Sequence, residues 1–289
     1  MDSLFVVGVA CISSLTRASI NLIDRWQFAY QKECVIQIAF LNNFLPLFLA
    51  ISGGLFLGYG ELIFKNILCL EAFFLGVIIQ TVAITFSYAM KKYELLKVTL
   101  MTRVSDFFIP IVFGFIGGFH NINQIGVQSI GFLITVPLFL KLKIFELSSF
   151  CFLVLIVLGI TAQAIFGRYL MENQLLHNNF EGLIFFTIGV IFWRTIWTLP
   201  LFFCKLKNLK IFISPSKITL LRSILTLVTQ ISFIYIISSI FIDIALPILN
   251  LTGLFSILLA SLLMKEKLGS NVLGLIFLTF LISGVSNYV

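Results

Sequence analysis

Ten apolar segments of about twenty residues run through the sequence, separated by short stretches rich in lysine, glycine and asparagine. A helix needs about 20 mainly apolar residues to cross the hydrocarbon core of a bilayer. Because lipid cannot hydrogen-bond the backbone, membrane-spanning chains form helices or closed β-barrels, and the strict alternation typical of barrel strands is absent here. The segments therefore predict an all-α integral membrane protein with ten transmembrane helices.

The predicted helices cover residues 3–22, 34–58, 68–90, 95–118, 123–140, 148–168, 180–203, 216–239, 242–264 and 270–288. Only 11% of the residues are charged and 60% are apolar, whereas a soluble domain has about 25% charged residues. This composition excludes a soluble nucleic-acid-binding protein, although the formal net charge is +7. The five cysteines lack Cys-x-x-Cys spacing, so they predict small core residues and no metal or disulfide framework.

Basic residues gather in the connections after the first, third, fifth, seventh and ninth predicted helices: Arg25, Lys32, Lys91, Lys92, Lys97, Lys141, Lys143, Lys205, Lys207, Lys210, Lys217, Lys265 and Lys267. The positive-inside rule predicts that these connections face the cytoplasm and that both termini lie outside. No basic residue precedes the first apolar segment, so we expect a retained helix and not a cleaved signal peptide. We expect a multi-pass protein, most simply of a bacterial inner membrane.

The two halves of the sequence resemble each other at a nearly constant spacing of about 150 residues. The matching pairs are Arg17 and Arg168, Pro46 and Pro200, and Gln80 and Gln230. A repeat with five crossings leaves its copy upside down in the membrane, and inverted repeats are an architecture of secondary transporters. We therefore predict two inverted five-helix repeats, residues 1–143 and 144–289.

Three short motifs resemble the EamA-like family of the drug/metabolite transporter superfamily. They are the turn at residues 264–268, the glycine-led segment 274–276 and the aromatic-arginine motif at 192–194. The resemblance implies ten helices in two repeats and transport of small molecules. The sequence departs from the family pattern at His120, where a turn glutamate would stand, and at residues 40–42, which replace the first arginine motif. Family members are usually drawn with cytoplasmic termini, opposite to the orientation that the charges predict.

Three ionisable residues fall deep inside predicted helices, where each costs about 2.5–3.5 kcal/mol on insertion scales. Arg103 and Asp106 are one turn apart, so they form either a structural ion pair or a proton-exchanging unit. Arg194, with Trp197 on the same face, has no carboxylate nearby in its own helix. It needs either a partner on another helix or a negatively charged substrate.

Other polar residues follow helical spacing and are expected to face the interior, for helix contacts or for a ligand. Arg17, Arg168 and Arg222 lie nearer to helix ends, where long side chains can also reach the interface. The candidate substrate-binding residues are Arg194, Arg103, Trp197, Gln80, Tyr88, Gln230, Asn250, Arg168 and Arg17. The candidate ion-coupling residues are Asp106 and Asp243.

These features predict a secondary transporter of a small anionic or zwitterionic metabolite, such as an amino acid or organic acid, driven by a proton or ion gradient or facilitative. Export of apolar or aromatic compounds is the alternative within transport. A membrane-embedded enzyme is disfavoured because no catalytic motif is present. The expected partners are a small-molecule substrate and the lipid bilayer, without nucleic acid, metal or cofactor, and the chain is expected to be a monomer or homodimer.

Overall fold

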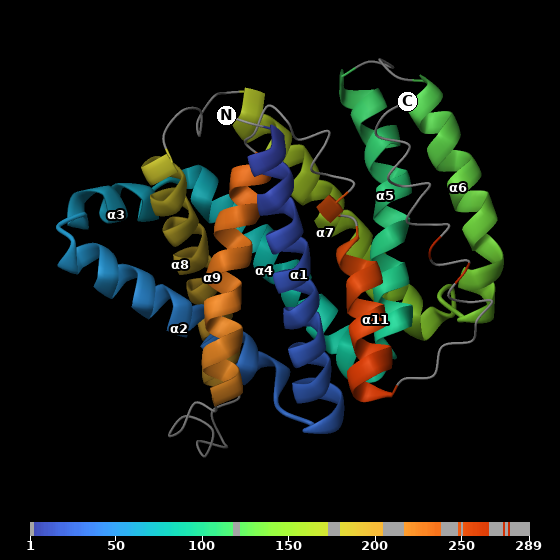
Figure 1. Ribbon diagram of the computed structural model, residues 1–289, viewed down its shortest axis with the longest axis horizontal. Coiled ribbons are helices and arrows are strands. Elements are labelled where there is room, and N and C mark those ends of the chain that lie inside the picture. Colours follow the sequence, from blue (N-terminus) through green and yellow to red (C-terminus); the bar gives the residue numbers. More distant parts are fainter. Residues whose placement is uncertain are drawn as a thin grey trace.

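The computed structural model describes residues 3–117, 122–172, 180–204, 217–237, 248–249, 251–265, 274 and 277. Every regular element within these residues is a helix, so the all-α prediction is confirmed for this part of the chain. The elements, shown in Figure 1, are α1 (Ser3–Arg25), the π-helix η1 (Trp26–Tyr30), α2 (Val35–Phe56), α3 (Gly60–Ile67), α4 (Leu70–Lys92), α5 (Leu95–Gly117), α6 (Ile122–Lys141), α7 (Leu147–Glu172), α8 (Phe180–Cys204), α9 (Lys217–Ile237) and α11 (Thr252–Met264).

Helix positions agree with the hydropathy pattern along most of the described chain. The first eight predicted helices coincide with α1, α2 and α4 to α9 to within about four residues. The helix predicted at 242–264 is described from 248, and α11 begins at Thr252. The helix predicted at 270–288 lies outside the described residues except for 274 and 277. Helix α3 is not predicted, because its eight residues are too few to cross a bilayer.

Six stretches of the described residues are long and apolar enough to cross a membrane: Leu4–Tyr30, Val35–Phe56, Leu70–Lys92, Leu147–Gly167, Glu181–Cys204 and Lys217–Ile236. Large apolar side chains stay exposed along their outer faces, among them Phe48, Leu155 and Leu221. A soluble monomer rarely exposes so much contiguous apolar surface, whereas contact with lipid requires it. The chain is therefore a multi-pass integral membrane protein.

Helices that are distant in the sequence pack side by side. Helix α1 packs against α9 and α11, α4 against α7 and α8, and α2 against α8 and α9, while α5 packs against α6, α7 and α11. Figure 1 shows α1 between α9 and α11. A buried apolar cluster that includes Val6, Leu75, Val190 and Ile234 joins α1, α4, α8 and α9. These contacts bring polar residues of both halves of the chain into one bundle.

At one end of this bundle, basic side chains donate hydrogen bonds to carbonyl groups of neighbouring helix ends. Arg25, the last residue of α1, donates through Nη1 to the carbonyl oxygens of Met90 and Tyr93 at the end of α4, at 2.6 Å each. Lys97 Nζ donates to the carbonyl oxygen of Lys143 at 2.8 Å. Carbonyl groups at a helix C-terminus lack helical donors and carry partial negative charge, so cations stabilise them. We call this the lysine-rich end.

Helices α4 and α8 approach each other closely at Gly76. A Cβ atom at this position would lie 2.8 Å from the carbonyl oxygen of Val190 and 2.9 Å from Cβ of Trp193. The first of these neighbours is backbone and cannot move without shifting α8. The close approach occurs one turn before Gln80 on α4 and beside Arg194 on α8, so it sets the distance between these two side chains.

We expect Gly76→Ala to lower the free energy of unfolding by about 1–3 kcal/mol, because the added methyl group overpacks the contact between α4 and α8. The matched control is Gly8→Ala in α1, where an added Cβ meets no atom within 4 Å and no loss is expected. Thermal unfolding of the purified variants in detergent measures both effects. Equal melting temperatures for the two variants would contradict the close packing at Gly76.

Candidate functional site

Arg194 is the most deeply buried unpaired charge among the described side chains. It lies on α8 and is 5% exposed. Its Nε donates to Oε1 of Gln80 on α4 at 3.1 Å, whereas its Nη1 is buried without a hydrogen-bond partner among the described residues. A buried charge is strongly unfavourable unless it is paired. The guanidinium is thus held in place on one edge and left with an unused donor on another.

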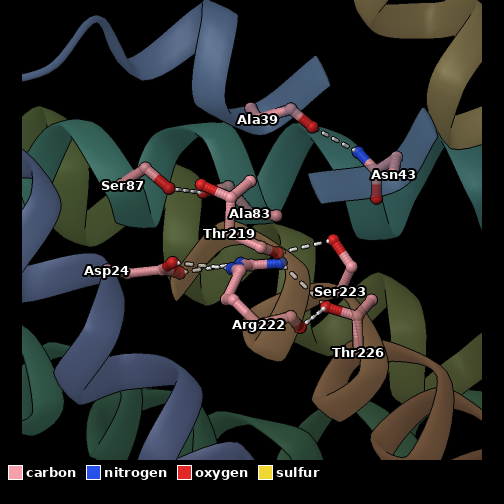
Figure 2. A network of polar contacts seen from close by, with 9 residues as sticks. All are labelled: Asp24, Ala39, Asn43, Ala83, Ser87, Thr219, Arg222, Ser223 and Thr226. Atoms are coloured by element: carbon pink, nitrogen blue, oxygen red, sulfur yellow. Dashed lines mark hydrogen bonds and ion pairs between the residues drawn. The ribbon is translucent and has the colours of Figure 1, made fainter. Parts of the chain in front are cut away.

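The Gln80 amide joins three helices. Its Oε1 accepts from Arg194 and also from Nδ2 of Asn43 on α2, at 3.0 Å. Asn43 Nδ2 donates in addition to the carbonyl oxygen of Ala39 at 2.8 Å, as Figure 2 shows. The Asn43 Oδ1 atom and both amide atoms of Asn42 are buried without partners in the described part of the chain. We call Arg194, Gln80 and Asn43 the Arg194 cluster.

A second charged group connects the two ends of the sequence. Arg222 on α9 forms a bidentate ion pair with Asp24 on α1, with Nε–Oδ1 and Nη2–Oδ2 distances of 2.8 Å each. Its Nη1 donates to Oγ1 of Thr226 at 2.8 Å (Figure 2). The Arg222 and Asp24 side chains are 11% and 7% exposed. The sequence left two placements open for Arg222, at the membrane interface or facing the interior. The structure has the second, because a buried carboxylate binds Arg222 inside the bundle.

Arg17, Arg103 and Arg194 occupy similar depths along their helices. At ~1.5 Å per residue, Arg17 lies about 12 Å from the end of α1 at the lysine-rich end, and Arg103 lies about 12 Å from the start of α5. Arg194 lies about 15 Å from the corresponding end of α8. A hydrocarbon core is about 30 Å thick, so these three residues are near its middle. The Asp24–Arg222 pair lies nearer to the lysine-rich end.

Three further arginines lie on helices of the same bundle as Arg194: Arg17 on α1, Arg103 on α5 and Arg222 on α9. The Arg17 guanidinium carbon lies 5.5 Å from the centre of the Phe233 ring on α9, and the side chain is exposed. Arg222 is paired with Asp24, whereas Arg194 has no ion pair among the described residues, so its guanidinium is the group of this set that attracts an anion.

The structure brings some of the predicted site residues together. Gln80 and Arg194 are in direct contact, and Arg103 is buried on α5. Arg17 is exposed on α1, with its guanidinium over the Phe233 ring. By contrast, Trp197 is 46% exposed on the outer face of α8, away from the buried face of Arg194. Tyr88 packs against two apolar clusters, one that includes Phe28 and Ile38 and one that includes Phe40 and Phe202.

The remaining predicted residues divide into two groups. Gln230 lies on α9 with a buried Oε1 that has no partner among the described residues. Asn250 and Asp243 lie outside the described residues, and so do the side chains of Asp106 and Arg168, although their backbones belong to α5 and α7. The predicted ion-coupling pair is therefore untested by this geometry.

The observed polar contacts include Asp24, Asn43 and Arg222, which are absent from the predicted site residues. Asp24 falls just beyond the predicted end of the first helix, which in fact continues to Arg25. Asn43 stands beside Asn42 near the middle of a strongly apolar helix. Two adjacent amides in such a segment predict a polar contact inside the bundle, because their polar groups need partners in lipid.

The described residues contain no group of three or more histidine, cysteine, aspartate or glutamate side chains that could hold a metal ion. Guanidinium and amide donors, which dominate the site, bind carboxylate or phosphate groups through charge-assisted hydrogen bonds. No family model matches the sequence, and a search of curated proteins finds no match.

Proposed function

We propose that this protein is a secondary transporter of the EamA-like kind, which moves a small anionic or zwitterionic metabolite such as an organic acid or amino acid. The observation that carries the proposal is the buried Arg194 guanidinium with its unused Nη1 donor near mid-membrane. A carboxylate or phosphate of a substrate would supply both the missing charge and the missing acceptor. Arginine suits this role because its planar fork binds such groups through two parallel hydrogen bonds.

The packing pattern supports an arrangement in two related halves. In the proposed repeats α1, α2, α4 and α5 correspond to α7, α8, α9 and α11. If each helix is replaced by its counterpart in the other half, the contact of α1 with α9 becomes a contact of α7 with α4. In the same way, the contact of α1 with α11 becomes a contact of α7 with α5. All four contacts are observed. The contact of α4 with α8 likewise becomes that of α9 with α2. Each of these three contacts thus has an observed counterpart, as expected for a pseudo-two-fold axis.

Alternating access follows from this arrangement. Arg194 belongs to the second half, whereas Gln80 and Asn43 belong to the first, so the substrate would bind at the boundary between the halves. A rocking motion of one half against the other would expose that boundary to each side in turn. Asp106 follows Arg103 by one turn on α5 and is the proposed proton carrier, which would couple uptake or efflux to a pH gradient.

Uptake by liposomes that contain the purified protein tests the proposed function. We expect saturable accumulation of at least one radiolabelled organic acid or amino acid, faster than in protein-free liposomes. Accumulation that rises with an imposed pH gradient would assign proton coupling, and equal exchange without a gradient would assign facilitative transport. Failure to transport any acid or amino acid, by a folded protein, would contradict the proposal.

A further inference from the structure

Two adjacent asparagines on α2 carry more buried hydrogen-bonding groups than the described residues satisfy. Asn42 and Asn43 are each 2% exposed. Both amide atoms of Asn42 and the Oδ1 atom of Asn43 have no hydrogen-bond partner among the described residues. Leaving a buried polar atom unsatisfied costs about 1–3 kcal/mol, and a ligand or a water molecule commonly accounts for such an atom. This part of α2 therefore offers hydrogen bonds to a group that the described side chains do not supply.

The Asn43 amide lies beside the Arg194 guanidinium, because both donate to one oxygen atom. Gln80 Oε1 accepts from Arg194 Nε at 3.1 Å and from Asn43 Nδ2 at 3.0 Å, so the two nitrogen atoms are at most about 6 Å apart. Asn43 Nδ2 also donates to the carbonyl oxygen of Ala39, and the Asn43 oxygen points away from that bond (Figure 2). Two donated hydrogen bonds thus orient the amide and leave its oxygen as an acceptor.

The unused atoms of these two groups have opposite hydrogen-bonding character. Arg194 Nη1 is a buried donor and Asn43 Oδ1 is a buried acceptor, both without partners among the described residues. Each belongs to the same planar group as a nitrogen bound to Gln80, so the two atoms lie in one small region. A carboxylate satisfies the donor but not the acceptor, because an ionised carboxylate has no proton to donate. The acceptor calls for a second, donating group on the same substrate.

We propose that the substrate carries an ammonium or a hydroxyl group next to its carboxylate, and that Asn43 Oδ1 accepts from this group while Arg194 binds the carboxylate. An α-amino acid and an α-hydroxy acid both have this arrangement, because donor and carboxylate are on adjacent carbon atoms. Hydrogen bonds of about 2.9 Å at each end allow such a compact group to bridge the two side chains. The inference rests on the proposed transport function and narrows its substrate class. Asn43 is the specificity residue that distinguishes this substrate from an acid without the donor.

Thermal stabilisation of the purified protein tests the inference, because a ligand that binds only the folded state raises its melting temperature. The probes are propionate, lactate and alanine, which share one carbon chain and carry, beside the carboxylate, no donor, a hydroxyl group and an ammonium group. We expect lactate, alanine or both to bind about tenfold more tightly than propionate, a difference of about 1.4 kcal/mol. Propionate and lactate have the same charge, so their comparison isolates the hydrogen bond. Tighter binding of lactate identifies a hydroxyl group, and tighter binding of alanine identifies an ammonium group.

Asn43→Ala should lower the affinity for lactate and alanine to that for propionate and leave propionate binding nearly unchanged. A purely structural Asn43 would instead lower all three affinities together. If Asn43→Ala fails to fold, Asn43→Ser keeps a hydroxyl acceptor and should reduce the preference. The matched control is Ser87→Ala on α4, which removes a similar bond to the preceding turn, from Ser87 Oγ to the Ala83 carbonyl oxygen at 2.8 Å (Figure 2). This control should leave the preference unchanged.

The variant Arg194→Gln separates failure of the inference from failure of the proposed function. Propionate bound as tightly as lactate and alanine, with stabilisation that Arg194→Gln removes, would refute the donor and leave transport of an acid standing. A buried water would then be the partner of Asn43 Oδ1. A preference that persists in Asn43→Ala, or a parallel loss of all three affinities, would refute the specificity role of Asn43. Absence of any stabilisation that depends on Arg194 would refute both the inference and the proposed function.

Discussion

Replacement of Arg194 by alanine is expected to abolish transport and to leave the protein folded. Truncating one partner of a buried, hydrogen-bonded charge pair costs about 2–5 kcal/mol of binding, which corresponds to a loss of at least about 30-fold in substrate affinity. In liposomes this appears as a raised KM or as absent uptake. The substrate would lose a buried guanidinium whose Nη1 donor is unused among the described residues.

The melting temperature of the Arg194→Ala variant distinguishes a substrate-binding role of Arg194 from a structural one. Arg194 has no carboxylate partner within the described residues, so its removal relieves the desolvation of an unpaired charge, and Gln80 keeps its hydrogen bond from Asn43. We therefore expect the melting temperature of Arg194→Ala, measured without substrate, to equal or exceed that of the unmodified protein. A structural arginine would instead leave a destabilised bundle.

Two further variants sharpen the test of Arg194. Arg194→Lys should restore transport poorly, because an ammonium group is a point charge and cannot reproduce the planar fork. Ile196→Ala, on the exposed face of the same helix, is the matched control and should transport normally. Unchanged KM and rate in Arg194→Ala would leave the proposed anionic substrate without support.

Removal of either partner of the Asp24–Arg222 pair should produce the largest loss of stability in this protein. Each partner alone would be a buried charge without a counterion, which costs about 3–5 kcal/mol of unfolding free energy. We expect Asp24→Asn and Arg222→Gln to show losses of this order. The double variant should recover most of the loss, because two neutral amides leave no buried charge.

A double-mutant cycle from equilibrium unfolding in detergent measures the coupling between Asp24 and Arg222 directly. The comparison is the exposed pair of Lys143 and Glu146, whose Nζ–Oε1 distance is 3.0 Å. This surface pair should contribute less than about 1 kcal/mol, because water and salt screen it. Additive losses in the Asp24 and Arg222 variants would show that the two side chains do not pair in the membrane protein.

The sequence alone located the long apolar helices of the described chain and the residue that is hardest to accommodate in lipid. Hydropathy is a local property, so segments of about 20 apolar residues locate helices without knowledge of their neighbours. The depth of Arg194 follows from counting along the same segment, and its polar environment follows from the cost of a charge in lipid. For α3 the same reasoning fails, because an amphipathic helix of eight residues has no membrane-length signal.

The partners of these polar residues depend on the tertiary structure. Asp24 meets Arg222, and Arg194 meets Gln80, through contacts between helices that lie far apart in the sequence. Helical periodicity places a side chain on a face, but the face does not reveal which helix packs against it. Packing decides which helices are neighbours. Gly76 has no side chain and allows α8 to pack closely against α4, and the Thr16–Thr229 hydrogen bond holds α1 against α9. The contact of Arg194 with Gln80 and the ion pair of Asp24 with Arg222 therefore became visible only when these helices were assembled.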